Sequence, residues 1–222
     1  MLIVGSQRVA DMGQTLDIGK RLELVPMDSH FQDITIGLYL QNLDSGSGFL
    51  VHTYSSKEGA QDRIAFVKRA MQVLGGMEVS SEGLLRFPCG SDHILAVRRI
   101  FLEACKLGPD GAVASRPLLL LDRKSGLSMV ATSLGSGKYH ISVDGESDEV
   151  VRRIRVVTGG LGKLGEMTAV DGVDDQVGFD CGQAHDALVG LLLLRAPNVR
   201  SILREIEQSA SRGVLSAPSA QT

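Results

Sequence analysis

The segment FPCGSDH at residues 87–93 recurs as FDCGQAH at residues 179–185, and this repeat determines how the rest of the chain is interpreted. Phenylalanine, cysteine, glycine and histidine hold the same places in both FxCGxxH segments, 92 positions apart. The two segments contain two of the three cysteines and two of the five histidines of the chain. The repeat therefore indicates that the chain consists of two related halves.

Similarity between the halves extends to both sides of the FxCGxxH segments. Residues 63–77 align with residues 153–167 at a shift of 90, and residues 97–104 align with residues 189–196 at a shift of 92. Repeats of about 90 residues are structural units in their own right rather than the short repeats of a solenoid. We expect a first repeat unit at residues 1–110, a second at residues 111–208, and a disordered tail at residues 209–222.

Hydrophobic patterns predict the same order of elements in both halves. In the first half, strands at 21–26, 34–40 and 49–54 precede a helix that ends at Gly75-Gly76, followed by a strand at 84–87 and a helix at 91–107. In the second half, strands at 118–122, 127–133 and 139–143 precede a helix from about 147, and the last predicted helix is at 199–208. The predicted fold class is α+β: a pseudo-twofold duplication of a strands-helix-strand-helix unit, with antiparallel or mixed sheets and helices on the outer faces.

This order of elements resembles the half-domain of imidazole-glycerol-phosphate dehydratase. In that family two such units pack their sheets around a pseudo-twofold axis, with the helices outside. The resemblance concerns topology alone, because the paired histidine and glutamate metal motifs of that enzyme are absent from this sequence. It therefore implies an arrangement of sheets and helices, and it implies neither an activity nor site residues.

Composition limits the classes of partner. A chain of 222 residues with 43% hydrophobic content can bury a sizeable core. The net charge of −3 does not favour nucleic acid or an anionic membrane surface as a partner, and the apolar run at 188–194 is too short to span a membrane. Three cysteines in a chain of this size favour a reducing compartment, so we expect a cytoplasmic protein. Sheet edges could pair between subunits, which would give a homodimer.

The Cys-Gly-x-x-His spacing brings two reactive side chains to the start of a helix. Residues four apart lie on one face of a helix, so His93 and His185 are expected to point inward together with Val97 and Val189. Each cysteine precedes a helix start, where free amide groups and the helix dipole lower the pKa of a thiol. A thiolate next to an imidazole can serve as a nucleophile with its base, or as a pair of metal ligands.

Three interpretations of these residues remain open at the level of sequence. In the first, they are core side chains that hold helix to sheet in a non-catalytic scaffold or interaction protein. In the second, both halves meet and form a tetrahedral zinc site from Cys89, His93, Cys181 and His185. In the third, the same four residues are candidates for a catalytic or small-molecule site near the helix starts. The leading hypothesis is a central small-molecule or metal site, and the alternative is the scaffold.

Other motifs carry less weight. The segment 160–165, GLGKLG, matches a dinucleotide-binding pattern, but its alignment with the first helix of the other half favours a helix end. Gly135-Ser136-Gly137 is expected to be a hairpin turn. Arg98-Arg99 is interpreted as part of a solvated helix face, and Cys105 as a core residue.

Overall fold

The computed structural model describes residues 21–26, 34–43, 46–108, 111–122, 127–145 and 147–198. The first half contains β1 (Arg21–Pro26), β2 (Thr35–Leu43), β3 (Gly46–Thr53), α2 (Ala60–Gly75), β4 (Glu78–Val79), β5 (Leu85–Arg86) and α3 (Ile94–Lys106). The second half contains β6 (Leu119–Asp122), β7 (Leu127–Gly135), β8 (Lys138–Val143), α4 (Ser147–Gly165), β9 (Met167–Val170), β10 (Val173–Phe179), α5 (Asp186–Leu193) and the 3-10 helix η2 (Ala196–Asn198). The predicted helix at 199–208 and the tail at 209–222 lie outside the described residues.

Two antiparallel sheets of five strands organise the two halves. Their strand orders are β1-β2-β3-β5-β4 and β6-β7-β8-β10-β9, so corresponding strands occupy corresponding places. The predicted α+β class is confirmed, and a β-hairpin stands in each half where one short strand was expected. Strand register gives a further equivalence: Phe49 pairs with Leu85, and Tyr139 pairs with Val177, which lies 92 positions after Leu85. Phe49 and Tyr139 therefore occupy equivalent places in the two sheets.

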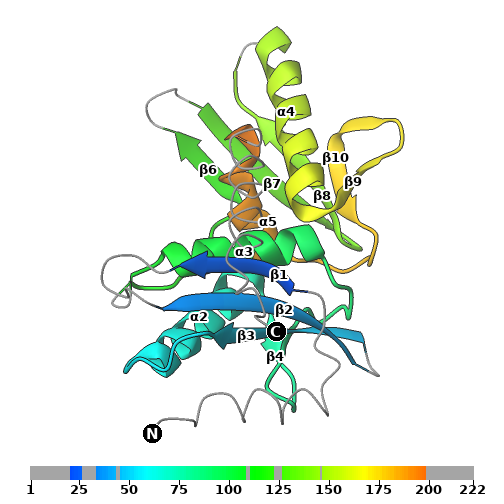
Figure 1. The fold of residues 1–222 in the computed structure, drawn as a ribbon. Helices are drawn as coiled ribbons and strands as arrows, with labels where there is room; N and C mark the ends of the chain where they lie inside the picture. The colour runs from blue at the N-terminus through cyan, green and yellow to red at the C-terminus, as the bar shows by residue number, and fades with distance from the viewer. Residues whose placement is uncertain are drawn as a thin grey trace, which may run out of the picture.

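The helices of the two halves contact one another, α2 with α5 and α3 with both α4 and α5. In Figure 1, α3 and α5 lie in the middle of the molecule, between β1–β3 on one side and β6–β8 on the other. This placement differs from the expected one on the outer faces, and from the helices-outside arrangement that the dehydratase resemblance implies. The reason is the sequence of α5, whose residues 188–193 are all buried. A helix that is apolar on every side has to be enclosed by other elements.

Helix α2 illustrates how the sequence sets the ends of these elements. Its predicted apolar stripe of Ile64, Val67, Met71 and Leu74 is buried in the core. The helix stops at Gly76, which has a φ of 63° and donates its N–H to the carbonyl of Gln72. Glycine adopts this left-handed conformation without a steric penalty from Cβ, so the predicted stop is confirmed.

The structure tests the weaker motifs as well. Residues 160–165 lie inside α4, and a Cβ at Gly160 would be 2.5 Å from the carbonyl oxygen of Ala196, so this glycine permits the close approach of η2 rather than opening a nucleotide-binding loop. Gly135 and Gly137 flank the turn between β7 and β8, as expected. The prediction of a solvated Arg99 is wrong, because this residue is only 1% exposed and its guanidinium pairs with Glu103. Within the described ranges, no helix has the length and apolar character that a membrane span needs.

Candidate metal centre

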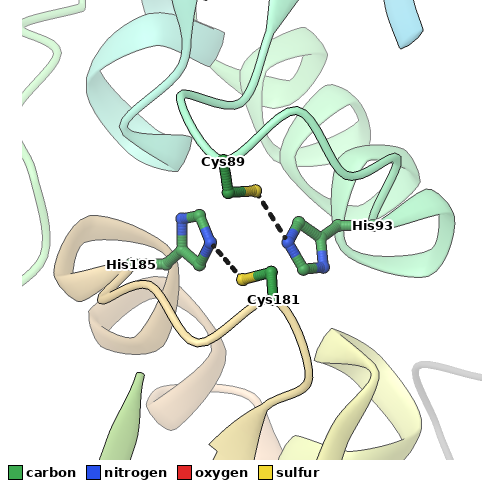
Figure 2. Close-up of side chains that lie close together, drawn as sticks. All are labelled: Cys89, His93, Cys181 and His185. Carbon is green, nitrogen blue, oxygen red and sulfur yellow. Dashed lines mark hydrogen bonds between the residues drawn. The ribbon is translucent and has the colours of Figure 1, made fainter. Parts of the chain in front are cut away.

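The four cysteine and histidine side chains of the FxCGxxH segments come together where the two halves meet. One ligand atom from each of Cys89, His93, Cys181 and His185 lies within 4.8 Å of all the others. Within each half, Sγ of the cysteine lies 3.3 Å from Nε2 of the histidine. Figure 2 shows the four side chains pointing toward one another from two loops on opposite sides of the cluster. The expectation that the two segments converge is therefore confirmed.

The same backbone turn positions the cysteine in each half. The amide of Gly90 donates to the carbonyl of Phe87 at 3.0 Å, and the amide of Gly182 donates to the carbonyl of Phe179 at 3.0 Å. These are β-turns with cysteine at the third position, and their glycines take φ values of 77° and 70°. The glycine of the motif is thus needed for its left-handed conformation.

Each histidine stands at the N-cap of the helix that follows the turn. The carbonyl of His93 accepts the amide of Val97 at 2.8 Å, and the carbonyl of His185 accepts the amide of Val189 at 2.9 Å. Both histidines are buried, with 8% and 6% of their surface exposed, as predicted from their helical spacing. Turn and helix start together determine the separation of thiol and imidazole within each half.

The phenylalanines of the motif surround the histidines, a role that the sequence analysis did not assign. The ring of Phe87 meets the rings of His93 and His185 edge to face, with centroids 5.0 and 5.6 Å apart. The ring of Phe179 meets the same two histidines at 5.4 and 4.8 Å. Their constant place in the repeated segment was the signal available in the sequence. Both phenylalanine rings are buried, and their edge-to-face contacts restrict the imidazole orientations.

In each half, a glycine of a β-hairpin lies close to the backbone of the FxCGxxH segment. A Cβ on Gly46, at the start of β3, would lie 3.0 Å from the carbonyl oxygen of Gly90. A Cβ on Gly137, between β7 and β8, would lie 2.8 Å from the carbonyl oxygen of Gln183. The amide of Phe179 also donates to the carbonyl of Gly137 at 3.1 Å. Sequence reasoning recognised the second hairpin and missed its contact with the site, because strand pairing brings together residues far apart in the chain.

Residues 92 positions apart face each other along the boundary between the halves. The rings of His93 and His185 are 4.9 Å apart, and the Glu103 carboxylate pairs with Arg195 at 2.6 Å. Cys89 and Cys181 belong to the same cluster. Contact between equivalent positions is what a twofold axis between two similar halves would produce.

The supports of the two histidines differ. In the second half, the fully buried Tyr139 accepts the amide of His185 at 2.8 Å and donates its hydroxyl to Oδ1 of Asp186 at 2.7 Å. Burial and the contact with Asp186 raise the pKa of this phenol, which keeps it a donor. In the first half, the carboxylate of Glu166 accepts the amide of Leu95 at 3.3 Å, so the start of α3 is capped from the other half.

Burial also determines the protonation states of the two histidines and of Cys181 when no metal is bound. It lowers the pKa of His93, and burial together with the neighbouring His93 lowers the pKa of His185 to about 4, so both imidazoles are neutral at pH 7. Burial raises the pKa of the Cys181 thiol, which contradicts the expected lowering by the helix start. The loss of solvation outweighs the amides, and this thiol points toward the carbonyl of Gln183, 3.9 Å away.

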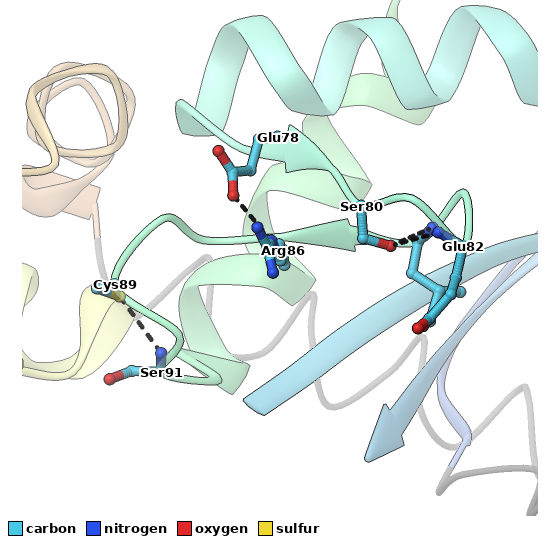
Figure 3. Close-up of polar contacts among 7 residues, drawn as sticks. Glu78, Ser80, Glu82, Arg86, Cys89 and Ser91 are labelled. Atoms are coloured by element: carbon cyan, nitrogen blue, oxygen red, sulfur yellow. Dashed lines mark hydrogen bonds and ion pairs between the residues drawn. The ribbon is translucent and has the colours of Figure 1, made fainter. Parts of the chain in front are cut away.

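The Cys89 sulfur also has a backbone amide as a neighbour. The amide of Ser91 points at it from 3.4 Å. Figure 3 shows this contact in the loop that follows β5 and its Arg86–Glu78 ion pair.

The donor set fits zinc. Zinc prefers tetrahedral sites of thiolate sulfur at about 2.3 Å and imidazole nitrogen at about 2.0 Å, which places ligand atoms roughly 3.3 to 3.8 Å apart. The two Cys–His pairs already have this spacing, and the longest separation of 4.8 Å needs a contraction of about 1 Å. The four residues therefore lie close enough to hold a metal ion. Two surface cavities that α4 helps to line, one with Val156 and Pro197 and one with Thr158 and Ala169, include none of the four side chains.

Comparison with protein-family models, with curated proteins and with solved structures gives no match for this chain. The function therefore has to be inferred from the side chains and their chemistry.

Proposed function

We propose that the protein binds one zinc ion through Cys89, His93, Cys181 and His185, and that this ion fastens its two halves together. The observation that carries the proposal is the meeting of four ligand atoms, two from each half, within 4.8 Å. Two thiols and two imidazoles are a common ligand set of structural zinc. Because each half supplies one thiol and one imidazole, neither half can complete the site alone.

Charge supports a divalent ion in this place. Two thiolates and Zn²⁺ give a complex with no net charge, which suits a site whose histidines are almost fully buried. The imidazoles need lose no proton at neutral pH, because burial lowers the pKa of both. The Cys181 thiol must lose its proton, and zinc is what would make its thiolate stable despite burial.

A non-catalytic role fits better than an enzymatic one. Catalytic zinc keeps an open position for water or substrate, whereas four protein ligands fill the tetrahedron. The geometry thus joins two hypotheses of the sequence analysis, a metal site and a scaffold. We infer further that the halves, residues 1–110 and 111–208, descend from one duplicated unit. A cytoplasmic location, a small-molecule ligand and a homodimer stay predictions, and the net charge of −3 still does not favour nucleic acid.

One observation favours a second candidate. The Cys–His separation of 3.3 Å in each half is compatible with a thiol nucleophile and its base. Such a pair works as thiolate and imidazolium. Burial opposes that ion pair at Cys181 and His185, since it raises the pKa of the thiol and lowers the pKa of the imidazole.

Metal analysis of the freshly purified protein tests the proposal. We expect about one zinc per chain, and loss of that zinc in both Cys89→Ser and Cys181→Ser. Cys105→Ala is the matched control, because Cys105 is a buried cysteine outside the cluster and its variant should keep the metal. A protein without zinc that also fails to bind added Zn²⁺ would refute the proposal. Rapid alkylation of Cys181 in that protein would favour the nucleophile.

A further inference from the structure

We infer that Tyr139 and Asp186 are positioning residues for the zinc site and that they support the His185 side of it alone. The inference rests on the proposed function, since it concerns how tightly the ligands of that site are held. Tyr139 lies on β8 with none of its surface exposed, and Asp186 is the first residue of α5.

The Tyr139 hydroxyl satisfies a backbone group that the helix cannot satisfy. His185 is the N-cap of α5, and its own side chain makes no capping hydrogen bond. Its amide donates to the Tyr139 oxygen at 2.8 Å, in a buried setting. The same hydroxyl donates to Asp186 at 2.7 Å, so its proton is directed away from the amide and its oxygen is left to accept. These two bonds fix the backbone from which the His185 imidazole projects.

Strand register shows that the first half lacks this device. Phe49, which has no hydroxyl, occupies the place equivalent to Tyr139. Ile94, 92 positions before Asp186, is the first residue of α3 and offers no carboxylate. The backbone of the two histidines differs accordingly, with a φ of 44° at His93 and −128° at His185. The two halves thus have the same strand order but support their histidine ligands unequally.

Loss of the hydrogen bonds that the Tyr139 hydroxyl makes should weaken metal binding more than it changes the fold. Residues that orient metal ligands typically contribute a factor of about 10 to 100 to metal affinity. Removing the Tyr139 oxygen leaves the buried His185 amide without its acceptor, so the chain near His185 shifts to find another. The imidazole then moves relative to the other three ligands, which alters both affinity and coordination geometry.

Tyr139→Phe tests the inference, with Phe49→Leu as the control at the equivalent place in the first half. Zn²⁺ affinity is measured by competition with a chelator, and geometry by the visible absorption of the Co²⁺-loaded protein. Tyr139→Phe should bind Zn²⁺ about tenfold more weakly and shift the Co²⁺ bands. Phe49→Leu should lower the stability of the metal-free protein while keeping affinity within about threefold and the bands unchanged.

Other outcomes separate the two proposals. If the wild-type protein binds Zn²⁺ and Tyr139→Phe binds it within about threefold of wild type with unchanged Co²⁺ bands, the positioning role is refuted and the zinc site stands. If Phe49→Leu weakens binding as much as Tyr139→Phe does, the effect is one of general stability and the inference also fails. If the wild type binds neither ion, the zinc site itself is refuted.

Discussion

Each half holds its cysteine and histidine on one segment, 87–93 in the first half and 179–185 in the second, which we call its ligand arm. The two ligand arms have the same backbone arrangement and differ in the side chains around it. Both place cysteine in a glycine-ended turn and histidine at a helix N-cap. Only the second arm has Tyr139 and Asp186 beside its histidine, and only the first has its helix start capped by Glu166. The comparison shows that turn and helix position the ligands, while the supporting side chains are free to differ between halves.

The two halves also differ in the charges that they place at the boundary between them. Glu103 and Arg195 occupy equivalent positions and pair with each other at 2.6 Å. Two identical subunits would bring like charges together at such a place near their axis. A single chain can carry opposite charges there, and Glu103 also pairs with the buried Arg99, whose equivalent in the second half is Leu191. Two unlike halves in one chain can therefore form an ion-pair network that a dimer of identical subunits could not form at this place.

Of the substitutions that test this comparison of the halves, Glu103→Gln should lower the unfolding free energy the most. The substitution removes a carboxylate from Arg99, which is 1% exposed, and such losses cost about 3 to 5 kcal/mol of unfolding free energy. Arg195→Ala should cost about 1 kcal/mol or less, because the Arg195 side chain is 42% exposed. Denaturant titration measures both. Equal costs would show that the pair across the boundary, rather than the Arg99 pair, dominates the network.

The pH dependence of the chelator-treated protein should separate the two histidines. The unfolded chain takes up a proton at His185 near pH 6.5, whereas the folded protein takes it up near pH 4, so stability falls as the pH is lowered through this window. The loss from His185 is about 3 kcal/mol, and His93 adds to it in the same direction. His185→Gln should flatten the stability curve more than His93→Gln does. A curve that stays steep in His185→Gln would contradict this assignment.

Glycine-to-alanine substitutions test how closely the helices pack. The two halves should respond alike at the equivalent Gly75 and Gly165, whereas Gly190 in the second half has a backbone neighbour. A Cβ at Gly75 would meet Ile100 Cδ1 at 2.5 Å, and a Cβ at the equivalent Gly165 would meet Leu192 Cδ1 at 2.4 Å. Flexible side-chain ends can move, so we expect each alanine variant to lose about 1 kcal/mol or less, by similar amounts. A Cβ at Gly190 would lie 2.2 Å from the carbonyl oxygen of Arg116, so Gly190→Ala should cost about 1 to 3 kcal/mol. Thermal unfolding ranks the three, and a large difference between Gly75→Ala and Gly165→Ala would argue against equivalent halves.

Much of this arrangement could be predicted from local sequence patterns. The repeated FxCGxxH segment, the apolar stripe of α2 and the glycine turn before β8 depend on short-range rules of spacing and conformation, and each is found as expected. The convergence of the four ligands followed from treating the repeat as two units that meet. These features require no knowledge of which distant elements touch.

The features that escaped prediction depend on long-range contacts. Tyr139 and Glu166 reach the site through strand pairing and helix packing, and their own sequence neighbourhoods gave no sign of it. Arg99 belongs to a charged pair of residues that is typical of a solvated face, but α3 lies between the halves and buries it. The raised pKa of Cys181 has the same origin, because burial depends on the whole fold.

X-ray absorption at the zinc edge of the purified protein tests the central claim most directly, because it reports the atoms bound to the ion. We predict two sulfur ligands at about 2.3 Å and two nitrogen ligands at about 2.0 Å, with the sulfur contribution halved in any zinc retained by Cys181→Ser. A wild-type spectrum dominated by oxygen ligands, or one without sulfur, would show that the ion is not held where the two halves meet and would contradict the account.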